Sequence, residues 1–425
     1  MNAPYSMKLL PALILSLLAG NAAASAFQLL EQTGSGLGNA YAGSAAVAEN
    51  ASTIFYNPAG MTQLKEHEFS TGGVLVAASF KFNDTGSNVG FLTGTGSGGN
   101  AGVLGFLPNA YMSWALNKDL YVGLGFGAPF GLKTKYDNPW VGAAQAISFD
   151  VKTYNINPSV AYRVNDSVSV GAGLNWQRLT AEYKRQVAVV SAVTAVSPLV
   201  LDLQDEALGW NVGALFTLTP ATKVGVSYRS AIKYKLTGDI GITGPSAALN
   251  ASRSSDAKAS LKLPDTFILS GTHQLSDKVQ LLGDISWTGW STIPKLDVLR
   301  TSGPFSGQIA QTLDTAFHDS VRVAIGANYQ YLGDLKLKFG IAHDQTPVRS
   351  AATRLVSLPD KNRIWLSTGA QWEINNDSVL DFGVTYLLLK KSKIDNDQLA
   401  DGRGRVTGNF QANAWLFGVQ YSRSF

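Results

Sequence analysis

The sequence has no cysteine among its 425 residues, which excludes disulfides, thiol nucleophiles and cysteine-ligated metals. Only 15% of the residues are charged, against about 25% in typical soluble domains. The 34 basic and 30 acidic residues are scattered singly, so nothing indicates a nucleic-acid-binding surface. Mean hydropathy is only +0.04, and no uncharged run approaches the roughly 20 apolar residues of a membrane-spanning helix. A soluble β-protein or an outer-membrane barrel remains.

Catalytic and metal-binding motifs are also missing. The four histidines, His67, His273, His318 and His343, lie far apart and show no metal-ligand spacing. The sequence contains no Gly-x-Ser-x-Gly nucleophile elbow. We therefore expect no enzymatic activity, no cofactor and no metal, although a lipase that brings serine and histidine together in space stays open.

The first 26 residues have the form of an export signal. Lys8 precedes the apolar run Leu9 to Leu18, which is too short to span a membrane. Small residues follow from Ala22 to Ala26 and offer cleavage after Ala24 or after Ala26. The mature protein is thus predicted to work outside the cytoplasm.

Beyond residue 66, apolar residues recur at every second position, the period of a strand with one apolar face. The pattern is clearest in the pairs 154–163 with 168–176, 210–218 with 224–228, and 321–331 with 335–341. The alternating positions carry glycine, serine, asparagine and charged residues. Six short turns rich in Asn, Asp, Gly and Pro separate the strands, near residues 117–119, 165–166, 220–222, 276–277, 333–334 and 375–377.

Seven longer, irregular connections alternate with these turns, near residues 81–105, 131–148, 184–206, 238–260, 291–317, 345–358 and 392–409. Thirteen connections join fourteen strands. An even number of strands, with short turns at one end and long loops at the other, is typical of a bacterial outer-membrane barrel. We predict an all-β fold, a 14-stranded antiparallel transmembrane β-barrel.

A soluble β-sandwich would also show period-2 alternation. Two features favour the barrel. The second face of each strand is rich in Gly and small polar residues, as in a filled lumen, and aromatic residues such as Tyr154, Tyr162, Trp365 and Trp372 sit near strand ends, as in interfacial girdles. In the last predicted strand, apolar residues occupy every second position up to the terminal Phe425.

Residues 27–65, which we call the hatch, are rich in Ala, Gly and Ser and lack strand alternation over most of their length. This segment resembles the N-terminal hatch of the FadL family of outer-membrane transporters for long-chain fatty acids and other hydrophobic compounds. The resemblance extends along the whole chain in order and spacing. The matching residues include Phe27-Gln28-Leu29, Glu31, Ser35 to Gly38, Ala40-Tyr41, Gly43, Asn57-Pro58-Ala59, Pro108-Asn109, Gly131-Leu132, Leu263-Pro264, Ser286-Trp287, Pro359-Asp360 and Ala414 to Gly418.

The resemblance implies a small hatch inside a barrel formed by residues 66–425. It implies that Asn57, Pro58 and Ala59 belong to this plug and that substrate occupies an internal pocket near the hatch N-terminus, at Phe27. It also implies that substrate leaves through a side opening at a kink in the third strand. In this sequence that strand, Tyr121 to Phe130, runs into Pro129 and Gly131. Proline lacks a ladder donor and glycine suits a bulge, although Pro129 could simply end the strand at a loop.

Charged residues raise two further expectations. A buried Glu31 or Glu49 in the hatch would need a partner, for which Arg163 and Arg363 are candidates. Arg185 has lumen parity when counted by twos along its strand, and its position matches a basic residue of the family's pocket. Its guanidinium could hold a carboxylate head group by two hydrogen bonds.

Two observations leave the role of Arg185 open. Arg185 could instead lie on the rim or pair with Asp202 or Glu206. A second basic residue of the fatty-acid members is missing, since the aligned stretch reads Thr312-Leu313-Asp314. That departure admits the family's other substrates, such as aromatic hydrocarbons.

We therefore expect an outer-membrane channel for passive uptake of hydrophobic compounds, foremost long-chain fatty acids. Aromatic hydrocarbons taken up by the same path, or a general diffusion porin, are the alternatives. We further expect a monomer in contact with outer-membrane lipid and lipopolysaccharide.

Overall fold

The computed structural model describes residues 26–90, 94–189 and 195–425. Apart from Ala26, the predicted export signal lies outside this range, and so does the predicted cleavage position after Ala24. Within the range, no helix is long and apolar enough to cross a membrane.

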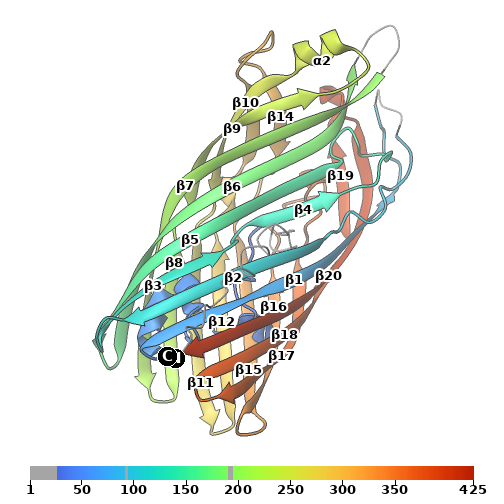
Figure 1. Cartoon of the computed structure of the whole chain (residues 1–425). Coiled ribbons are helices and arrows are strands. Elements are labelled where there is room, and N and C mark those ends of the chain that lie inside the picture. The colour runs from blue at the N-terminus through green and yellow to red at the C-terminus, as the bar shows by residue number, and fades with distance from the viewer. Residues whose placement is uncertain (1–25, 91–93, 190–194) are drawn as a thin grey trace, which may run out of the picture.

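Twenty β-segments combine into a closed 14-strand antiparallel barrel, as predicted (Figure 1). Closure comes from β1 and β20, which pair from Glu68 opposite Ser424 to Asp84 opposite Gly408. Six of the fourteen strands are interrupted and consist of two segments each. In order the strands are β1 (His67–Asp84), β2 (Leu104–Ala115), β3 with β4 (Leu120–Gly127, Gly131–Lys135), β5 (Ser148–Asn165), β6 (Val168–Val189), β7 (Ala195–Thr219), β8 with β9 (Thr222–Arg229, Ile232–Ile242), β10 with β11 (Ser255–Leu263, Thr266–Ser276), β12 with β13 (Val279–Thr288, Lys295–Arg300), β14 with β15 (Ile309–Asp314, Ser320–Gln330), β16 (Leu335–Asp344), β17 (Arg363–Asn375), β18 with β19 (Ser378–Leu389, Ser392–Asp397) and β20 (Arg405–Ser424).

The six predicted short turns are all present, at the lower end of the barrel in Figure 1. Five predicted long connections are wrong in part. β4 lies within 131–148, β13 and β14 lie within 291–317, and β19 and the start of β20 lie within 392–409. The other two differ more. β6 continues to Val189 and β7 begins at Ala195, so most of the predicted loop 184–206 is paired strand. β9 and β10 similarly shorten the predicted loop 238–260 to a link that contains α2 (Ala247–Arg253). The short helical turn η4 (Trp290–Thr292) lies in the interruption between β12 and β13, and η5 (Leu399–Asp401) lies in the upper connection between β19 and β20.

The outer face of the lower barrel is apolar, as the alternation predicts. Leu174 is 61% exposed and Val212 is 42% exposed, while Asn175 and Asn211 point inward and are buried. One aromatic assignment is wrong: Trp365 is fully buried on the lumen side, whereas Trp372 is half-exposed. Residues seven apart on a strand face opposite sides, so these two tryptophans could not both belong to a lipid-facing girdle.

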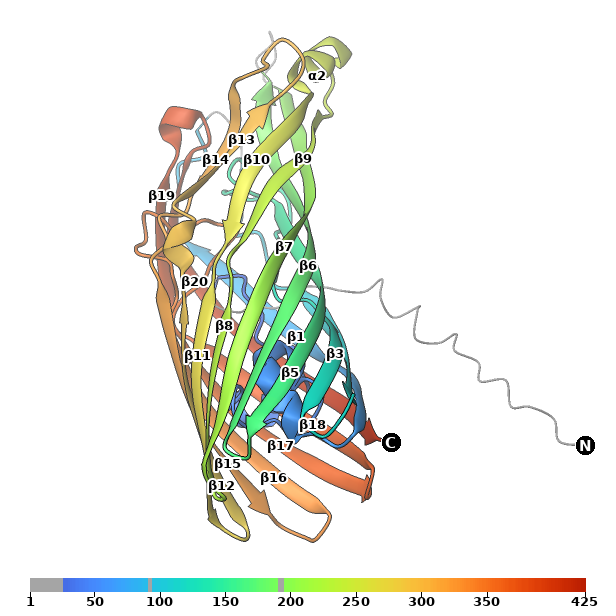
Figure 2. The same cartoon turned by 90° about the vertical axis from the view of Figure 1, so that its left-hand side faces the viewer.

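The hatch lies inside the lower half of the barrel (Figure 2). It consists of short pieces, η2 (Gly36–Asn39), α1 (Thr53–Tyr56) and η3 (Pro58–Gln63), joined by turns. Nearly all of its residues are buried against the wall. The barrel is therefore a filled structure at this level and not an open pore.

Candidate functional site

The hatch backbone touches the wall where glycine occurs. A Cβ atom on Gly171 of β6 would lie 2.5 Å from the Ala59 nitrogen, and one on Gly34 of the hatch would lie 2.7 Å from the Val419 carbonyl carbon in β20. Either contact would force the hatch away from the wall, because atoms this close clash. Small residues on the lumen face thus set how closely the hatch can fit.

Asn57, Pro58 and Ala59 fasten the middle of the hatch. The Asn57 side-chain amide donates to the carbonyls of Ala45 at 2.7 Å and of Ala214 in β7 at 2.9 Å. Its Oδ1 accepts from the Ala59 nitrogen at 3.1 Å, which caps η3, and Pro58 occupies the first turn. The predicted hatch tripeptide therefore ties one part of the hatch to another and to the wall.

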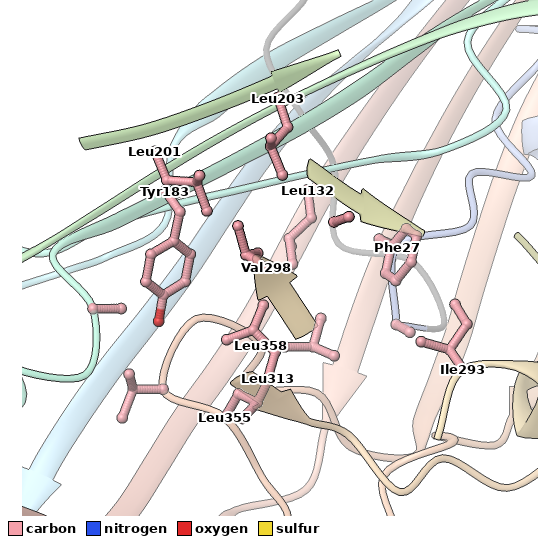
Figure 3. Packing of buried hydrophobic residues seen from close by; sticks show 14 of the residues in the cluster. Phe27, Leu132, Tyr183, Leu201, Leu203, Ile293, Val298, Leu313, Leu355 and Leu358 are labelled. Atoms are coloured by element: carbon pink, nitrogen blue, oxygen red, sulfur yellow. The ribbon is translucent and has the colours of Figure 1, made fainter. Parts of the chain in front are cut away.

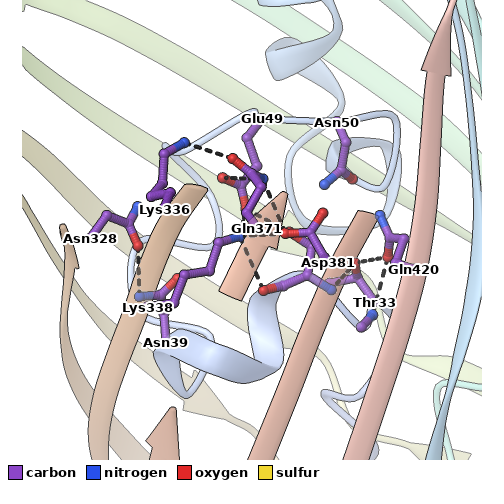
Figure 4. A network of polar contacts seen from close by, with 12 residues as sticks. Thr33, Asn39, Glu49, Asn50, Asn328, Lys336, Lys338, Gln371, Asp381 and Gln420 are labelled. Atoms are coloured by element: carbon purple, nitrogen blue, oxygen red, sulfur yellow. Dashed lines mark hydrogen bonds and ion pairs between the residues drawn. The ribbon is translucent and has the colours of Figure 1, made fainter. Parts of the chain in front are cut away.

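A buried lysine joins the hatch to two strands (Figure 4). The Lys338 ammonium on β16 is fully buried and lies 2.6 Å from Glu49 of the hatch and 2.9 Å from Asp381 on β18. It also donates to the Ser35 hydroxyl at 2.9 Å, and Gln371 donates to Asp381 at 3.0 Å. Burial alone would raise the pKa of Glu49, but the adjacent Lys338 lowers it below its ordinary value. Neither predicted partner, Arg163 nor Arg363, contacts Glu49.

Above the hatch the polarity of the two strand faces reverses. Along β7 the inward residues change from Asn211 to Leu203 and Leu201, while the outward residues change from Trp210 to Asp202. β6 changes in the same way, and so does the interrupted strand from β8, which buries Ser227, to β9, which buries Tyr234 and Leu236. An apolar interior with a charged exterior indicates that this part of the barrel stands in water and encloses a space for apolar groups.

That space is an apolar cavity of about 70 Å³. It is lined by Phe27 of the hatch, by Tyr183, Leu201 and Leu203 of β6 and β7, and by Ile293, Val298, Leu313, Leu355 and Leu358 (Figure 3). The volume would admit several waters, but each ordered water needs two to four polar partners, and this lining offers few. Phe27 packs edge-on against Trp290, with ring centroids 4.9 Å apart.

The third barrel strand is broken where Pro129 and Gly131 occur. β3 ends at Gly127, β4 begins at Gly131, and β4 pairs only with β5. β2 pairs with β3 only from Ala110 onward, so residues 104–109 have no ladder partner on that side. The wall therefore has a gap in its strand pairing beside the break.

The hatch N-terminus covers this break. Leu29 donates its backbone N–H to the Pro129 carbonyl, and Gly131 donates to the Phe27 carbonyl, both at 2.8 Å. The Gln32 side chain accepts from the Ala128 nitrogen and donates to the Ala128 carbonyl, both at 2.9 Å. Gln32 thereby replaces a missing ladder partner, a role that no sequence signal revealed.

Arg185 is buried on the inward face of β6, two residues beyond Tyr183 of the cavity. Its Nε has no hydrogen-bond partner among the described residues, and its Nη1 contact with the Gln186 carbonyl is long at 3.5 Å. The alternative partners Asp202 and Glu206 point outward, and Glu206 pairs with Arg178 at 3.7 Å. Arg185 thus has lumen parity, as predicted.

A second cation lies near Arg185, although not where the resemblance places one. Thr312 bonds to Asp297 at 2.7 Å and Leu313 lines the cavity, so this stretch supplies no positive charge. Arg403, from the connection between β19 and β20, instead approaches the Thr312 carbonyl at 3.5 Å and acts electrostatically on Arg185. Its distance in sequence explains why the pattern did not reveal it.

The chain matches, over residues 15–425, the family described as outer membrane protein transport protein (OMPP1/FadL/TodX). It is 33% identical to outer membrane protein P1 of Haemophilus influenzae, over 96% of this chain and 97% of that protein. It is 27% identical to the long-chain fatty acid transport protein of Escherichia coli K12, over 97% of each.

Solved structures share the fold. A FadL homologue of Pseudomonas aeruginosa superposes with a TM-score of 0.87 at 21% identity, covering 94% of this chain and all of that one. The toluene transporter TodX of Pseudomonas putida superposes with a TM-score of 0.70 at 14% identity, covering 92% and 98%.

The shared lysine generates a first prediction. Lys338→Met leaves Glu49 and Asp381 buried without their cation, and breaking a buried ion pair costs about 3–5 kcal/mol. We expect a lower melting temperature and higher ion conductance in planar bilayers, because the hatch loses its attachment to β16 and β18.

Lys336→Met is the matched control. Lys336 sits two residues away and bonds to Gln371 at 2.7 Å, but it is only part-buried. It should change both readouts less than Lys338→Met, because Lys336 acts on Glu49 through space and forms no ion pair with Glu49 or Asp381. A Lys338→Met protein with wild-type conductance and melting temperature would show that this ion pair does not hold the hatch.

Proposed function

The chain belongs to the family of outer membrane transport proteins that includes OMPP1, FadL and TodX, and from this membership we propose that it admits hydrophobic compounds, foremost long-chain fatty acids, by passive diffusion. Its location in the bacterial outer membrane follows from the same membership. The observation that carries the proposal is the apolar cavity between the hatch and the upper connections.

The apolar cavity lowers the free-energy cost of moving a hydrocarbon chain through the barrel. Each methylene group returned to water costs about 0.8 kcal/mol, so a water-filled pore is a poor path for a long alkyl chain. A chain that moves from the extracellular side into a space lined by Leu and Phe side chains keeps its hydrocarbon out of water. No described polar pore competes with this path, because the hatch fills the lumen below.

Arg185 is the proposed head-group ligand, with Arg403 contributing positive charge. A guanidinium presents parallel N–H groups that match a carboxylate. Its free Nε supports this role. Phe27 closes the cavity from below and would contact the alkyl chain.

The break at Pro129 and Gly131 is the proposed exit to the membrane. A strand with an unpaired stretch beside it is the weakest part of a barrel wall, since closed pairing is what allows a barrel to stand in lipid. Movement of Phe27 and Leu29 away from the break would connect the cavity to that gap. Asn57, Pro58 and Ala59 would meanwhile hold the rest of the hatch in place.

This scheme needs no nucleotide, cofactor or catalytic residue, and we propose a monomeric transporter and no enzyme. Its substrate would diffuse down its own gradient. Lipopolysaccharide is the proposed neighbour of the charged outer surface above the membrane, where Lys133, Lys152 and Lys184 point outward.

Aromatic hydrocarbons are a second candidate substrate class. The stretch Thr312-Leu313-Asp314 carries no cation, and the cavity lining itself holds no charged residue. A neutral ligand would fit such a lining without a head-group partner.

Native mass spectrometry after gentle extraction tests the proposed function. We expect retained lipid-like masses, fatty acids first, that delipidation removes and added fatty acid restores. A protein that retains no hydrophobic molecule and binds none on addition would contradict the proposal.

Arg185→Ala should weaken fatty-acid binding more than hydrocarbon binding. Hydrogen bonds to charged groups contribute about 1.5–3 kcal/mol, so we expect a loss of roughly tenfold or more for a long-chain fatty acid. Affinity for a neutral hydrocarbon of equal length should change little. Calorimetry or fluorescence displacement measures both. Equal losses would argue against a head-group role, and outward-facing Arg178→Ala is the matched control.

A disulfide at the break tests the exit. Gln28 and Phe130 face each other as an antiparallel bridge, and such pairs bring Cα atoms within disulfide range. In this cysteine-free chain, oxidised Gln28→Cys with Phe130→Cys should stop uptake into liposomes, and reduction should restore it.

A second disulfide serves as the control for hatch movement as a whole. The Thr62 and Ser169 hydroxyls lie 2.7 Å apart, between η3 and β6. Oxidised Thr62→Cys with Ser169→Cys should leave uptake intact. If the disulfide at the break fails to slow uptake, the exit lies elsewhere. If both disulfides stop uptake, the hatch must move as one body.

A further inference from the structure

Glu31 is a buried carboxylate without a partner. It is 1% exposed, and neither carboxylate oxygen has a hydrogen-bond partner among the described residues. The adjacent Leu30 lines a small cavity of about 10 Å³ together with Arg322, Asp344 and Trp365. That space holds about one water at most, and Glu31 is not among the residues that line it.

The wall facing Glu31 is already rich in carboxylates. Arg322 on β15 lies 3.5 Å from Asp284 of β12. Arg363 on β17 lies 3.5 Å from Asp344 of β16 and 2.6 Å from Asp360. The guanidinium groups of Arg322 and Arg363 thus lie beside three carboxylates. An ionised Glu31 would add a fourth negative charge. Arg322 Nε has no hydrogen-bond partner among the described residues, and Arg363 Nε makes only the 3.5 Å ion-pair contact with Asp344.

On the hatch side, the groups that face Glu31 are neutral tyrosines. Tyr41 and Tyr56 stack with ring centroids 6.0 Å apart, and both feel the charge of Glu31. Their hydroxyls donate to the carbonyls of Thr33 and Leu30 and not to the carboxylate. Burial raises the pKa of Glu31 to about 7, against the smaller opposing effects of its own backbone N–H and of Arg363 and Arg322.

Glu31 is also placed to act on the wall break. Its neighbour Gln32 holds Ala128 by two hydrogen bonds, and Leu29 holds Pro129. A shift of Glu31 toward water or toward a guanidinium would pull on both attachments.

We propose that Glu31 is a proton-controlled latch: neutral in the closed hatch, and on ionisation displacing residues 27–32 from the break in the wall. The assignment of that break to substrate exit rests on the proposed function, but the latch itself does not. No binding partner or ligand is required for it to work.

The sign of the pH dependence follows from proton linkage. The closed hatch binds the Glu31 proton more tightly than a displaced, hydrated hatch, whose Glu31 would titrate near its ordinary pKa of 4.5. The closed state is therefore fully favoured below about pH 4.5 and loses its advantage as pH rises toward about 7. The full difference corresponds to roughly two orders of magnitude in the opening equilibrium.

The test is thiol labelling at the break. Leu29→Cys places one buried thiol there in a cysteine-free chain, and a methanethiosulfonate reagent reports its exposure in the full-length mature protein in liposomes. The rate is divided, at each pH from 5 to 8, by that of the Leu29→Cys, Glu31→Gln protein, so the titration of the thiol cancels. We expect this ratio to rise at least tenfold from pH 5 to pH 8.

Two further variants separate a latch from a merely structural residue. Glu31→Asp keeps a titratable group and should keep the rise. Glu49→Gln removes a carboxylate from the Lys338 ion pair, so it should raise the labelling rate at every pH but leave the rise of the ratio with pH unchanged. A ratio that stays constant with pH would overturn the proposal. If the ratio rises but the protein takes up no hydrophobic compound at any pH, the latch stands and the proposed function fails.

Discussion

A segment can fill a membrane barrel only if the charges that it brings into the lumen meet opposite charges on the wall. In this protein Lys338 provides the central match, because one ammonium serves Glu49 of the hatch and Asp381 of β18. Asn57 and Gln32 satisfy backbone groups in the same way at other points. With these contacts in place the hatch can be irregular and rich in small residues, since the barrel supplies the partners that a regular element would supply for itself.

The second constraint is the change of polarity along the strands. In the lower barrel lipid contacts apolar side chains and the lumen face is polar, so the hatch fits. In the upper barrel the faces exchange character: Leu201 and Leu203 point inward and Asp202 points outward. The outer face of the continuous strand β7 therefore contacts lipid in the lower barrel and water in the upper barrel. The apolar chamber forms at the level where the polarity of the two faces has fully reversed. The hatch N-terminus, at Phe27, closes this chamber from below.

Much of the architecture could be predicted from local pattern. The six short turns and the apolar outer face depend on period-2 alternation and turn residues, which a single sequence displays. The enclosed hatch was expected from the family resemblance. The extension of β6 and β7 was missed because the reversed polarity there reads as a loss of alternation. The prediction for Trp365 is wrong because residues seven apart on a strand face opposite sides, so Trp365 and Trp372 cannot both face lipid. Lys338, Gln32 and Arg403 act through residues far away in sequence, and no local signal reveals such contacts.

The central claim is that the barrel is closed by its hatch and holds an apolar chamber above it. Ion conductance of the purified wild-type protein in planar bilayers tests this most directly. The account predicts no steady ohmic current, because the lumen is filled and the chamber excludes hydrated ions. A stable current of the size expected for an open 14-strand pore would contradict it and would instead indicate a general diffusion porin.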